Sequence, residues 1–191
     1  MTIGFDLDDL LLGFFDALHP YCNNRYGTSC QRGDLTSFSL AKLWGVSEEE
    51  ATKRVFDFYQ SSEHWGAKPV DGSVEGIKKL KQHHKLHVIT AKPEELKDKT
   101  LEWLDKHFPQ MFDGIHFTNH YNGNGLKRSK GEVCKELGIE LFVDDFLENV
   151  NNVANFDIPA LLFDAPWNQG EVKLPITRVY SWDEIVDILS K

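Results

Sequence analysis

The chain has 191 residues, of which 41% are hydrophobic and 27% are charged, the balance of a soluble globular protein. This length is enough for one well-buried domain with a small accessory lobe, and it disfavours two full domains. No apolar stretch approaches the roughly 20 residues of a membrane-spanning helix, so we expect no membrane partner. The formal net charge of −9 argues against a nucleic acid polymer as partner, because polymer binding depends on a basic surface.

The three cysteines, Cys22, Cys30 and Cys134, are odd in number and lack CxxC spacing. We interpret them as reduced thiols of a cytoplasmic protein. Met1 is followed almost at once by a predicted strand, which leaves no room for the charged and apolar regions of a secretion signal. We therefore expect a cytoplasmic protein, and the sequence predicts no oligomeric state.

Short apolar runs rich in β-branched or aromatic residues recur along the chain and predict strands. Helical patterns separate most of these runs, and strands that alternate with helices predict a mostly parallel sheet covered on both faces. The expected fold class is therefore α/β, with a Rossmann-like, three-layer core. The predicted strands span 3–7, 86–90, 114–118, 140–143 and 160–163, with a weaker one at 177–180, and the helices span 73–80, 93–107, 129–137, 147–155 and 182–189.

Residues 14–68 break this alternation. The segment is rich in aromatic residues and mostly helical in pattern, and Ser47 followed by Glu48 resembles a helix N-terminus. A stretch of about 55 residues is far longer than an ordinary connection between a strand and the next unit. We interpret it as a helical cap inserted after the first strand, with a catalytic core formed by 1–13 and 69–191. The alternative is a helical subdomain that only completes the core.

The first predicted strand runs into the acidic sequence Asp6-Leu7-Asp8-Asp9. Because side chains alternate along a strand, Asp6 and Asp8 are expected to point to the same side. In an open α/β sheet, ligands bind outside the carboxyl ends of the strands, where this pair falls. The four residues alone are also compatible with an ordinary acidic loop.

A second acidic pair, Asp144-Asp145, follows the predicted strand at 140–143. Two unit charges ~4 Å apart repel by about 4 kcal/mol at an effective dielectric constant near 20. Converging carboxylates therefore need a cation, and hard oxygen ligands select Mg²⁺. We predict a magnesium site that comprises Asp6, Asp8, Asp144 and Asp145.

Groups suited to phosphate binding lie between the two acidic pairs. The strand at 86–90 ends in Thr90, which offers a hydroxyl and free backbone N–H groups. Lys127, Arg128 and Lys130 form a basic group around the start of the helix predicted from 129. These cationic side chains are able to clamp a phosphate.

The order of these parts resembles the haloacid dehalogenase (HAD) superfamily of phosphatases over almost the whole chain. Its four motifs match Asp6 to Leu10, then Thr90, Lys130 and the pair Asp144-Asp145. Within that superfamily the chain is most similar to the 5′(3′)-deoxyribonucleotidases. The narrower similarity rests on the segments Thr90-Ala91-Lys92-Pro93, Phe142-Val143-Asp144-Asp145 and Leu162-Phe163-Asp164-Ala165-Pro166-Trp167-Asn168.

The resemblance implies a Mg²⁺-dependent phosphomonoester hydrolase that works through an aspartyl-phosphate. Asp6 would be the nucleophile, and Asp8 the general acid and then the general base. Thr90 and Lys130 would bind the phosphoryl oxygens, with Lys127 as the alternative lysine. Mg²⁺ would be held by Asp6, the backbone carbonyl of Asp8, and Asp145, with Asp144 acting through water.

The expected substrate is a small-molecule phosphate monoester, and in particular a (deoxy)nucleoside 5′-monophosphate. Ala91 and Lys92 join Thr90 and Lys130 as expected substrate-binding residues, although Ala91 stands where nucleotidase relatives often carry Ser. Aromatic rings of the 14–68 segment, namely Phe14, Phe38 and Trp65, are expected to face the active site and stack on a base. The alternatives are a sugar phosphate or phosphoglycolate as substrate, and a non-catalytic phosphate-binding protein on the same fold.

Overall fold

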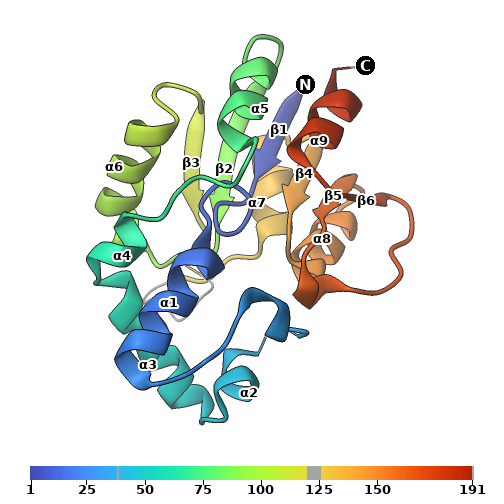
Figure 1. Ribbon diagram of the computed structural model, residues 1–191. Coiled ribbons are helices and arrows are strands. Elements are labelled where there is room, and N and C mark those ends of the chain that lie inside the picture. Colours follow the sequence, from blue (N-terminus) through green and yellow to red (C-terminus); the bar gives the residue numbers. More distant parts are fainter. Residues whose placement is uncertain (38, 120–125, 191) are drawn as a thin grey trace.

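The structure of the protein, a computed structural model, describes residues 1–37, 39–119 and 126–190. In these residues six parallel strands form one sheet in the order β3-β2-β1-β4-β5-β6, with helices on both faces (Figure 1). This confirms the predicted α/β, Rossmann-like core. The strands are β1 (Thr2–Phe5), β2 (Lys85–Thr90), β3 (Gly114–Phe117), β4 (Leu141–Asp144), β5 (Ala160–Phe163) and β6 (Ile176–Val179).

The strands lie within one or two residues of their predicted bounds, and the difference at β1 affects the site. β1 ends at Phe5, so the acidic sequence follows the strand instead of lying on it. The N–H of Asp6 still donates to the carbonyl of Val143, at 2.9 Å, but beyond it the carbonyl of Leu7 accepts from the N–H groups of Leu11 and Leu12. The chain therefore turns after Asp8, so strand alternation is not what positions Asp6 and Asp8, although both side chains line the same cavity.

The helices form two layers. On one face α5 (Ser73–Leu80), α6 (Lys97–His107) and α9 (Trp182–Leu189) pack in the largest hydrophobic cluster. On the other face α7 (Lys130–Leu137) and α8 (Leu147–Ala154) pack in two smaller clusters. The helix predicted over 93–107 begins with a short 3₁₀ turn, η2 (Glu94–Leu96).

The order of the strands determines where the candidate site lies in the fold. The chain builds β1, β2 and β3 outward on one side, then crosses back to place β4 on the other side of β1. Connections at the carboxyl ends of β1 and β4 therefore run in opposite directions and leave a crevice between them, the usual ligand site of such sheets. The two acidic pairs of the sequence meet at this crevice.

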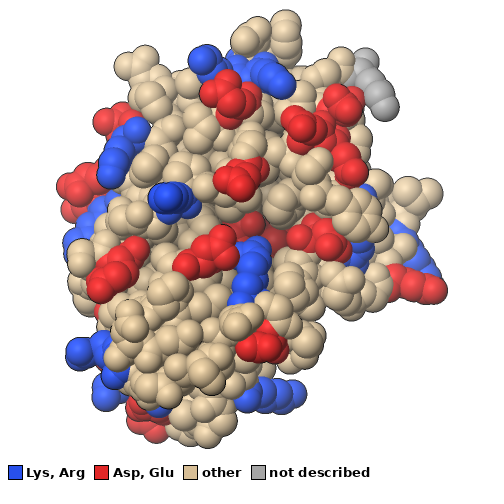
Figure 2. Space-filling view, viewed as in Figure 1, with Lys and Arg blue, Asp and Glu red and all other residues tan. Residues whose placement is uncertain are grey.

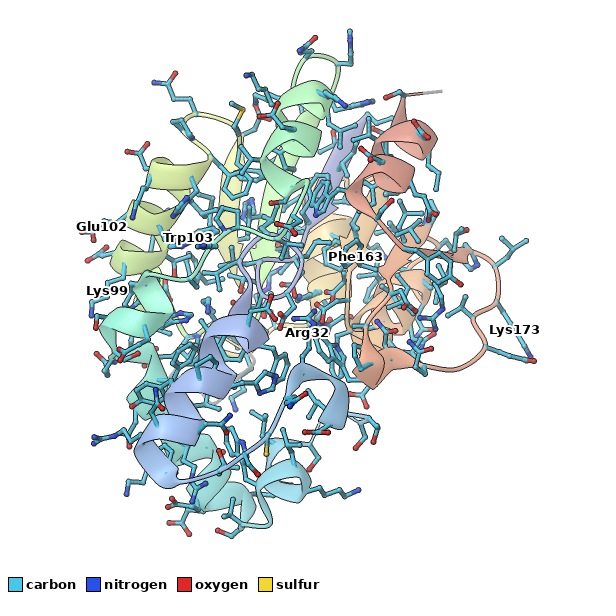
Figure 3. All side chains as sticks on the ribbon, viewed as in Figure 1. Arg32, Lys99, Glu102, Trp103, Phe163 and Lys173 are labelled. Atoms are coloured by element: carbon cyan, nitrogen blue, oxygen red, sulfur yellow. The ribbon has the colours of Figure 1, made fainter. Side chains whose placement is uncertain are left out.

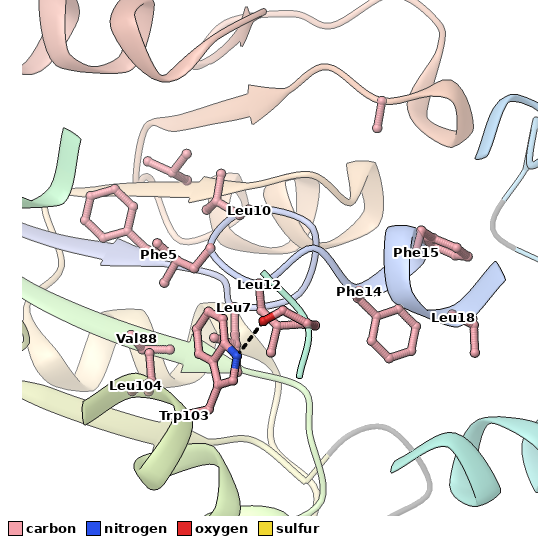
Figure 4. Close-up of a cluster of buried hydrophobic side chains, with 14 of the residues drawn as sticks. Phe5, Leu7, Leu10, Leu12, Phe14, Phe15, Leu18, Val88, Trp103 and Leu104 are labelled. Carbon is pink, nitrogen blue, oxygen red and sulfur yellow. Dashed lines mark hydrogen bonds between the residues drawn. The ribbon is translucent and has the colours of Figure 1, made fainter. Parts of the chain in front are cut away.

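The 14–68 segment lies beyond the carboxyl ends of the strands (Figure 1). Its buried rings belong to the same hydrophobic cluster as Phe5 of β1, and Figure 4 shows part of that cluster. The indole Nε1 of Trp103 donates to the carbonyl of Ala67, at 2.9 Å, and holds the returning chain against α6. That this segment is a distinct cap over a core of 1–13 and 69–191 stays a prediction. Its elements are α1 (Phe14–Tyr26), η1 (Arg32–Asp34), α2 (Leu40–Trp44), α3 (Glu48–Tyr59) and α4 (Ser62–Trp65).

Two other expectations concern the cysteines and membrane-spanning helices. All three cysteines are free, with Cys22 and Cys134 buried and Cys30 partly buried. Throughout the described ranges, no helix has the length and apolar character needed to cross a membrane.

The close contact between β1 and β4 generates a first prediction, on stability. A Cβ atom at Gly4 would lie 2.9 Å from Cδ2 of Phe142 and 3.1 Å from Cδ1 of Ile89. Gly4→Ala should therefore overpack the centre of the sheet and lower the free energy of unfolding by about 1–3 kcal/mol. Urea denaturation measures the change. Gly33→Ala is the matched control, because a Cβ atom at Gly33 would meet no atom within 4 Å; equal stability of the two variants would contradict the prediction.

Candidate active site

Three carboxylates meet in the crevice between β1 and β4. Asp6 follows β1, Asp144 ends β4 and Asp145 follows it, and one oxygen from each lies within 4.8 Å of the others. Their exposed fractions are 7%, 0% and 4%, respectively. Like charges held this close in a buried place repel strongly, so cations must offset them.

Lys130 supplies one of these cations. Its Nζ atom lies 2.6 Å from Oδ1 of Asp6 and 2.7 Å from Oδ2 of Asp144. Ser129 caps α7, as the sequence predicts, and so starts the helix with Lys130 pointing at the carboxylates. Burial lowers the pKa of Lys130, but Asp144 and Asp6 outweigh burial and raise it overall, so the side chain stays charged.

The rest of the basic group does not reach the crevice. Lys127 is exposed, and Arg128 pairs with Glu136 on the surface. The structure thus places Lys130, and not Lys127, beside the carboxylates. A cationic clamp built from all three basic residues is wrong for the described conformation, because Lys130 alone of them contacts Asp6.

Asp144 and Asp145 have different surroundings. Asp144 accepts from the backbone N–H of Phe146 at 2.8 Å and from Nδ2 of Asn149 at 3.0 Å, and burial raises its pKa to about 7. Asp145 accepts from the indole Nε1 of Trp167 at 2.8 Å. Burial and then the charge of Asp144 raise the pKa of Asp145 well above its usual value.

Asp145 makes no ion pair with any residue that the structure describes. Lys130 therefore pairs with two of the three carboxylates, and among the described residues the cluster has fewer cationic than carboxylate groups. Clustered carboxylate oxygens suit a hard divalent cation such as Mg²⁺. The donor set thus fits the metal that the sequence predicts.

The carboxylate of Asp8 is not part of this cluster, so the expected convergence of four carboxylates is wrong for the side chains. Its Oδ1 atom lies 2.9 Å from Nζ of Lys92. Burial raises the pKa of Asp8 despite this cation. The backbone N–H of Lys92 in turn donates to the hydroxyl of Thr90, at 3.2 Å, which brings the end of β2 to the site.

A cavity of about 140 Å³ lies against these groups. The sheet side contributes the acidic residues with Ala91, Lys92 and Lys130, whereas the 14–68 segment contributes apolar side chains. Phe14 therefore lies where the sequence predicts it, at the wall of the cavity. The lining comprises Asp6, Asp8, Asp9, Phe14, Phe15, Leu40, Val55, Tyr59, Ala91, Lys92, Lys130, Asp145, Phe146 and Asn149.

The two other aromatic residues predicted to face the substrate have different outcomes. Phe38 lies outside the described residues. Trp65 does not line the cavity: its Nε1 donates to the carbonyl of Tyr59 at 2.8 Å, and Lys99 lies over its ring at 5.9 Å. In this conformation Trp65 is therefore not positioned to stack on a base in the cavity.

Sequence reasoning missed a second cationic contact, made by Arg32. Its Nη1 atom lies 2.9 Å from Oδ1 of Asp9 and 3.3 Å from Asp16, and its guanidinium lies 4.7 Å from the ring centroid of Trp167. Figure 3 labels Arg32 where the 14–68 segment meets the core, and Figure 2 shows acidic side chains on both sides of that position. Burial raises the pKa of Asp9 to about 7. A single arginine in a predicted connection carries no pattern that would have singled it out.

Comparisons with known proteins agree with this geometry. A family described as "5′ nucleotidase, deoxy (Pyrimidine), cytosolic type C protein" matches residues 1–191. YqfW of Bacillus subtilis (strain 168), whose name gives nucleotidase as a candidate activity, is 30% identical over 97% of this chain and 92% of its own. A 5′(3′)-deoxyribonucleotidase of the same strain is 24% identical over 96% of this chain and 95% of its own.

Solved structures show the same fold at lower identity. The haloacid dehalogenase-like hydrolase SP0104 from Streptococcus pneumoniae has a TM-score of 0.68 at 15% identity, and covers 98% of this chain and 97% of its own. The candidate HAD-hydrolase YfnB from Bacillus subtilis, bound to magnesium, has a TM-score of 0.69 at 15% identity. The match covers 100% of this chain and 98% of the YfnB chain.

The chain thus has the fold of haloacid dehalogenase-like hydrolases, and the family match and the named nucleotidases make it a phosphoric monoester hydrolase. Within it, the chain belongs to the cytosolic type C 5′-nucleotidase family.

The shortage of positive charge in the carboxylate cluster leads to a second prediction, on metal binding. Mg²⁺ at ~100 times its Kd should stabilise the folded protein by about 2.7 kcal/mol, a shift of several degrees in Tm. Asp145→Asn should melt as high as the parent, or higher, in chelator, because one charge of the cluster is gone. It should gain little from Mg²⁺. Thermal melts in chelator and in millimolar Mg²⁺ measure both effects, and an equal gain in the two proteins would exclude Asp145 as a ligand.

The difference in stability between the parent and Asp145→Asn should depend on pH, and the direction of this change follows from the pKa shifts. Burial raises the pKa of Asp144 to about 7 and raises that of Asp145, so the folded protein holds protons that the unfolded chain loses near pH 4. In chelator the parent should therefore lose stability, relative to Asp145→Asn, as the pH rises from about 4 to above 7. Melts across this range check the sign, with the exposed Asp98→Asn as control.

Proposed function

We propose that the protein hydrolyses nucleoside 5′-monophosphates in a Mg²⁺-dependent reaction through an aspartyl-phosphate on Asp6. One observation carries the proposal. Asp6 lies at the wall of a cavity, in contact with the Lys130 ammonium, and belongs to a cluster of three carboxylates of which Lys130 pairs with only two. A buried carboxylate beside a fixed cation and a predicted metal site is well placed to attack a phosphate ester.

In the first step a carboxylate oxygen of Asp6 attacks phosphorus, and the bond from phosphorus to the ester oxygen breaks. Asp8 gives its proton to that oxygen, and the alcohol leaves. In the second step water attacks the phosphorus, Asp8 takes a proton from the water, and the bond to Asp6 breaks to release phosphate. The raised pKa of Asp8 supports its role as proton donor.

Residues at the cavity wall and at the end of β2 offset the negative charge of the phosphoryl group. Lys130 lies beside Asp6, Ala91 lines the cavity, and the Thr90 hydroxyl is buried at the end of β2. Asp6, the backbone carbonyl of Asp8, and Asp145 would hold Mg²⁺, with Asp144 acting through water. When bound, the metal supplies positive charge where the substrate and the cluster are both negative.

The family description and the names of the relatives support a nucleotide substrate. Phe14 and Tyr59 offer rings on the 14–68 side of the cavity. The family description and the three free cysteines also support the cytoplasm as the place of action.

One observation favours a second candidate. A cavity of about 140 Å³ is smaller than the 300–1,000 Å³ of most ligand pockets. A smaller ester, such as a sugar phosphate or phosphoglycolate, fits this conformation more easily, and a nucleotide requires the 14–68 segment to move as a cap.

The nucleophile assignment gives a fourth prediction. Asp6→Asn should abolish turnover and keep the fold, because the amide has no anionic oxygen with which to attack phosphorus. Phosphate release and circular dichroism measure the two properties. Asp98→Asn, at an exposed position of α6, is the matched control. Turnover of Asp6→Asn within tenfold of the parent would contradict the assignment.

The substrate assignment gives a fifth prediction. In a panel of phosphorylated metabolites, nucleoside 5′-monophosphates, and deoxy forms among them, should have the highest kcat/KM. Sugar phosphates or phosphoglycolate above every nucleotide would favour the second candidate.

A further inference from the structure

Lys92 is a fully enclosed cation, with a side-chain exposure of 0%. It follows β2, but most of its surroundings come from the 14–68 segment. Its Nζ atom lies 4.6 Å from the ring centroid of Tyr59 and 5.3 Å from that of Phe14. Besides these rings it contacts Asp8 and, at 3.3 Å, the Nε2 atom of His64. An ammonium is therefore held between the proposed acid and a histidine of another part of the chain.

His64 comes from α4 and has an exposure of 0%. Burial, then the charges of Lys92 and Lys99, hold its pKa well below the usual value, so the ring is neutral. A neutral ring that accepts from Lys92 at Nε2 carries its proton on Nδ1. Among the described residues this Nδ1 has no hydrogen-bond partner.

An unpaired buried N–H costs about 1–3 kcal/mol of stability. The ring otherwise packs among aromatic rings, with centroids 4.4 Å from Trp65 and 4.9 Å from Phe58, where an apolar side chain would carry no such cost. The contact of Nε2 with Lys92 is what distinguishes histidine from leucine here. What sets His64 apart from the other buried histidine, His19, is therefore this contact with Lys92, and it points to a role in the site.

We propose that His64 is a positioning residue: it holds the Lys92 ammonium beside Oδ1 of Asp8, and this contact fixes the orientation of the Asp8 carboxyl group at the cavity. This inference rests on the proposed role of Asp8 in the hydrolysis. Among the described residues the buried Oδ1 has no hydrogen-bond partner, so its 2.9 Å contact with Lys92 is an ion pair. The Asp8 side chain as a whole keeps 25% of its surface exposed and lines the cavity.

The experiment compares two esters that differ in their need for an acid. An alkyl ester such as a nucleoside 5′-monophosphate needs a proton on its leaving oxygen, whereas p-nitrophenolate leaves without one. His64→Leu should lower kcat/KM for the alkyl ester ~10-fold more than for p-nitrophenyl phosphate, a part of the 10²–10⁴-fold that general acid catalysis contributes. The ratio of the two values does not depend on how much of the variant is folded.

Three further variants sharpen the result. His64→Gln keeps an acceptor for Lys92 and should restore most of the ratio, and Lys92→Met should change it at least as much as His64→Leu. His19→Leu is the matched control, because His19 is a buried histidine of α1 whose ring nitrogens have no hydrogen-bond partner among the described residues. It should leave the ratio unchanged.

The outcomes separate this inference from the function on which it rests. A parent that hydrolyses neither ester overturns the proposed function, and the inference with it. An active parent whose ratio is unchanged in His64→Leu or in Lys92→Met overturns the inference alone. A His64→Gln variant as impaired in the ratio as His64→Leu also overturns it, because the hydrogen-bond acceptor would then not matter.

Discussion

The ammonium of Lys130, shared between two buried carboxylates, is the interaction on which the site depends. Parallel pairing of β1 with β4 brings Asp6 and Asp144 together, and their charges would push the strand ends apart without it. The position of Lys130 depends on close packing behind it. A Cβ atom at Gly131 would lie 2.5 Å from the ring of Phe156, so only glycine lets the first turn of α7 approach α8 this closely. Helix packing on one face of the sheet thus fixes a charge at its edge.

The 14–68 segment reaches the same edge through two further cations, one from each side. Arg32 extends from the segment to Asp9 on the core, and Lys92 extends from the core into the rings of the segment. Both contacts end on residues of the turn after β1. This turn, which carries the proposed nucleophile and acid, is therefore fixed by charges from two parts of the chain far apart in sequence.

The sequence predicted the sheet and much of the site because both rest on local patterns. Buried parallel strands are continuous apolar runs, and Asp6, Asp144 and Lys130 stand where such runs end or a capped helix begins. The pairing of Asp8 with Lys92 could not be predicted from local patterns, because it depends on where the chain turns after Phe5. Arg32 and His64 are single residues without spacing to a partner, and their roles arise from tertiary contacts alone. Lys127 and Lys130 are equivalent by composition, and only the helix start separates them.

The enclosure of Lys92 has a consequence for how this enzyme can change over evolution. Phe14 and Tyr59 line the cavity, where they would set which leaving group fits, and the same two rings surround the ammonium that contacts Asp8. A substitution that enlarges the cavity for a new substrate also loosens the cation beside the acid. Selectivity and rate are therefore not independent traits in this chain. Leu40 and Val55 also line the cavity, and substitutions there would leave the two rings around Lys92 in place.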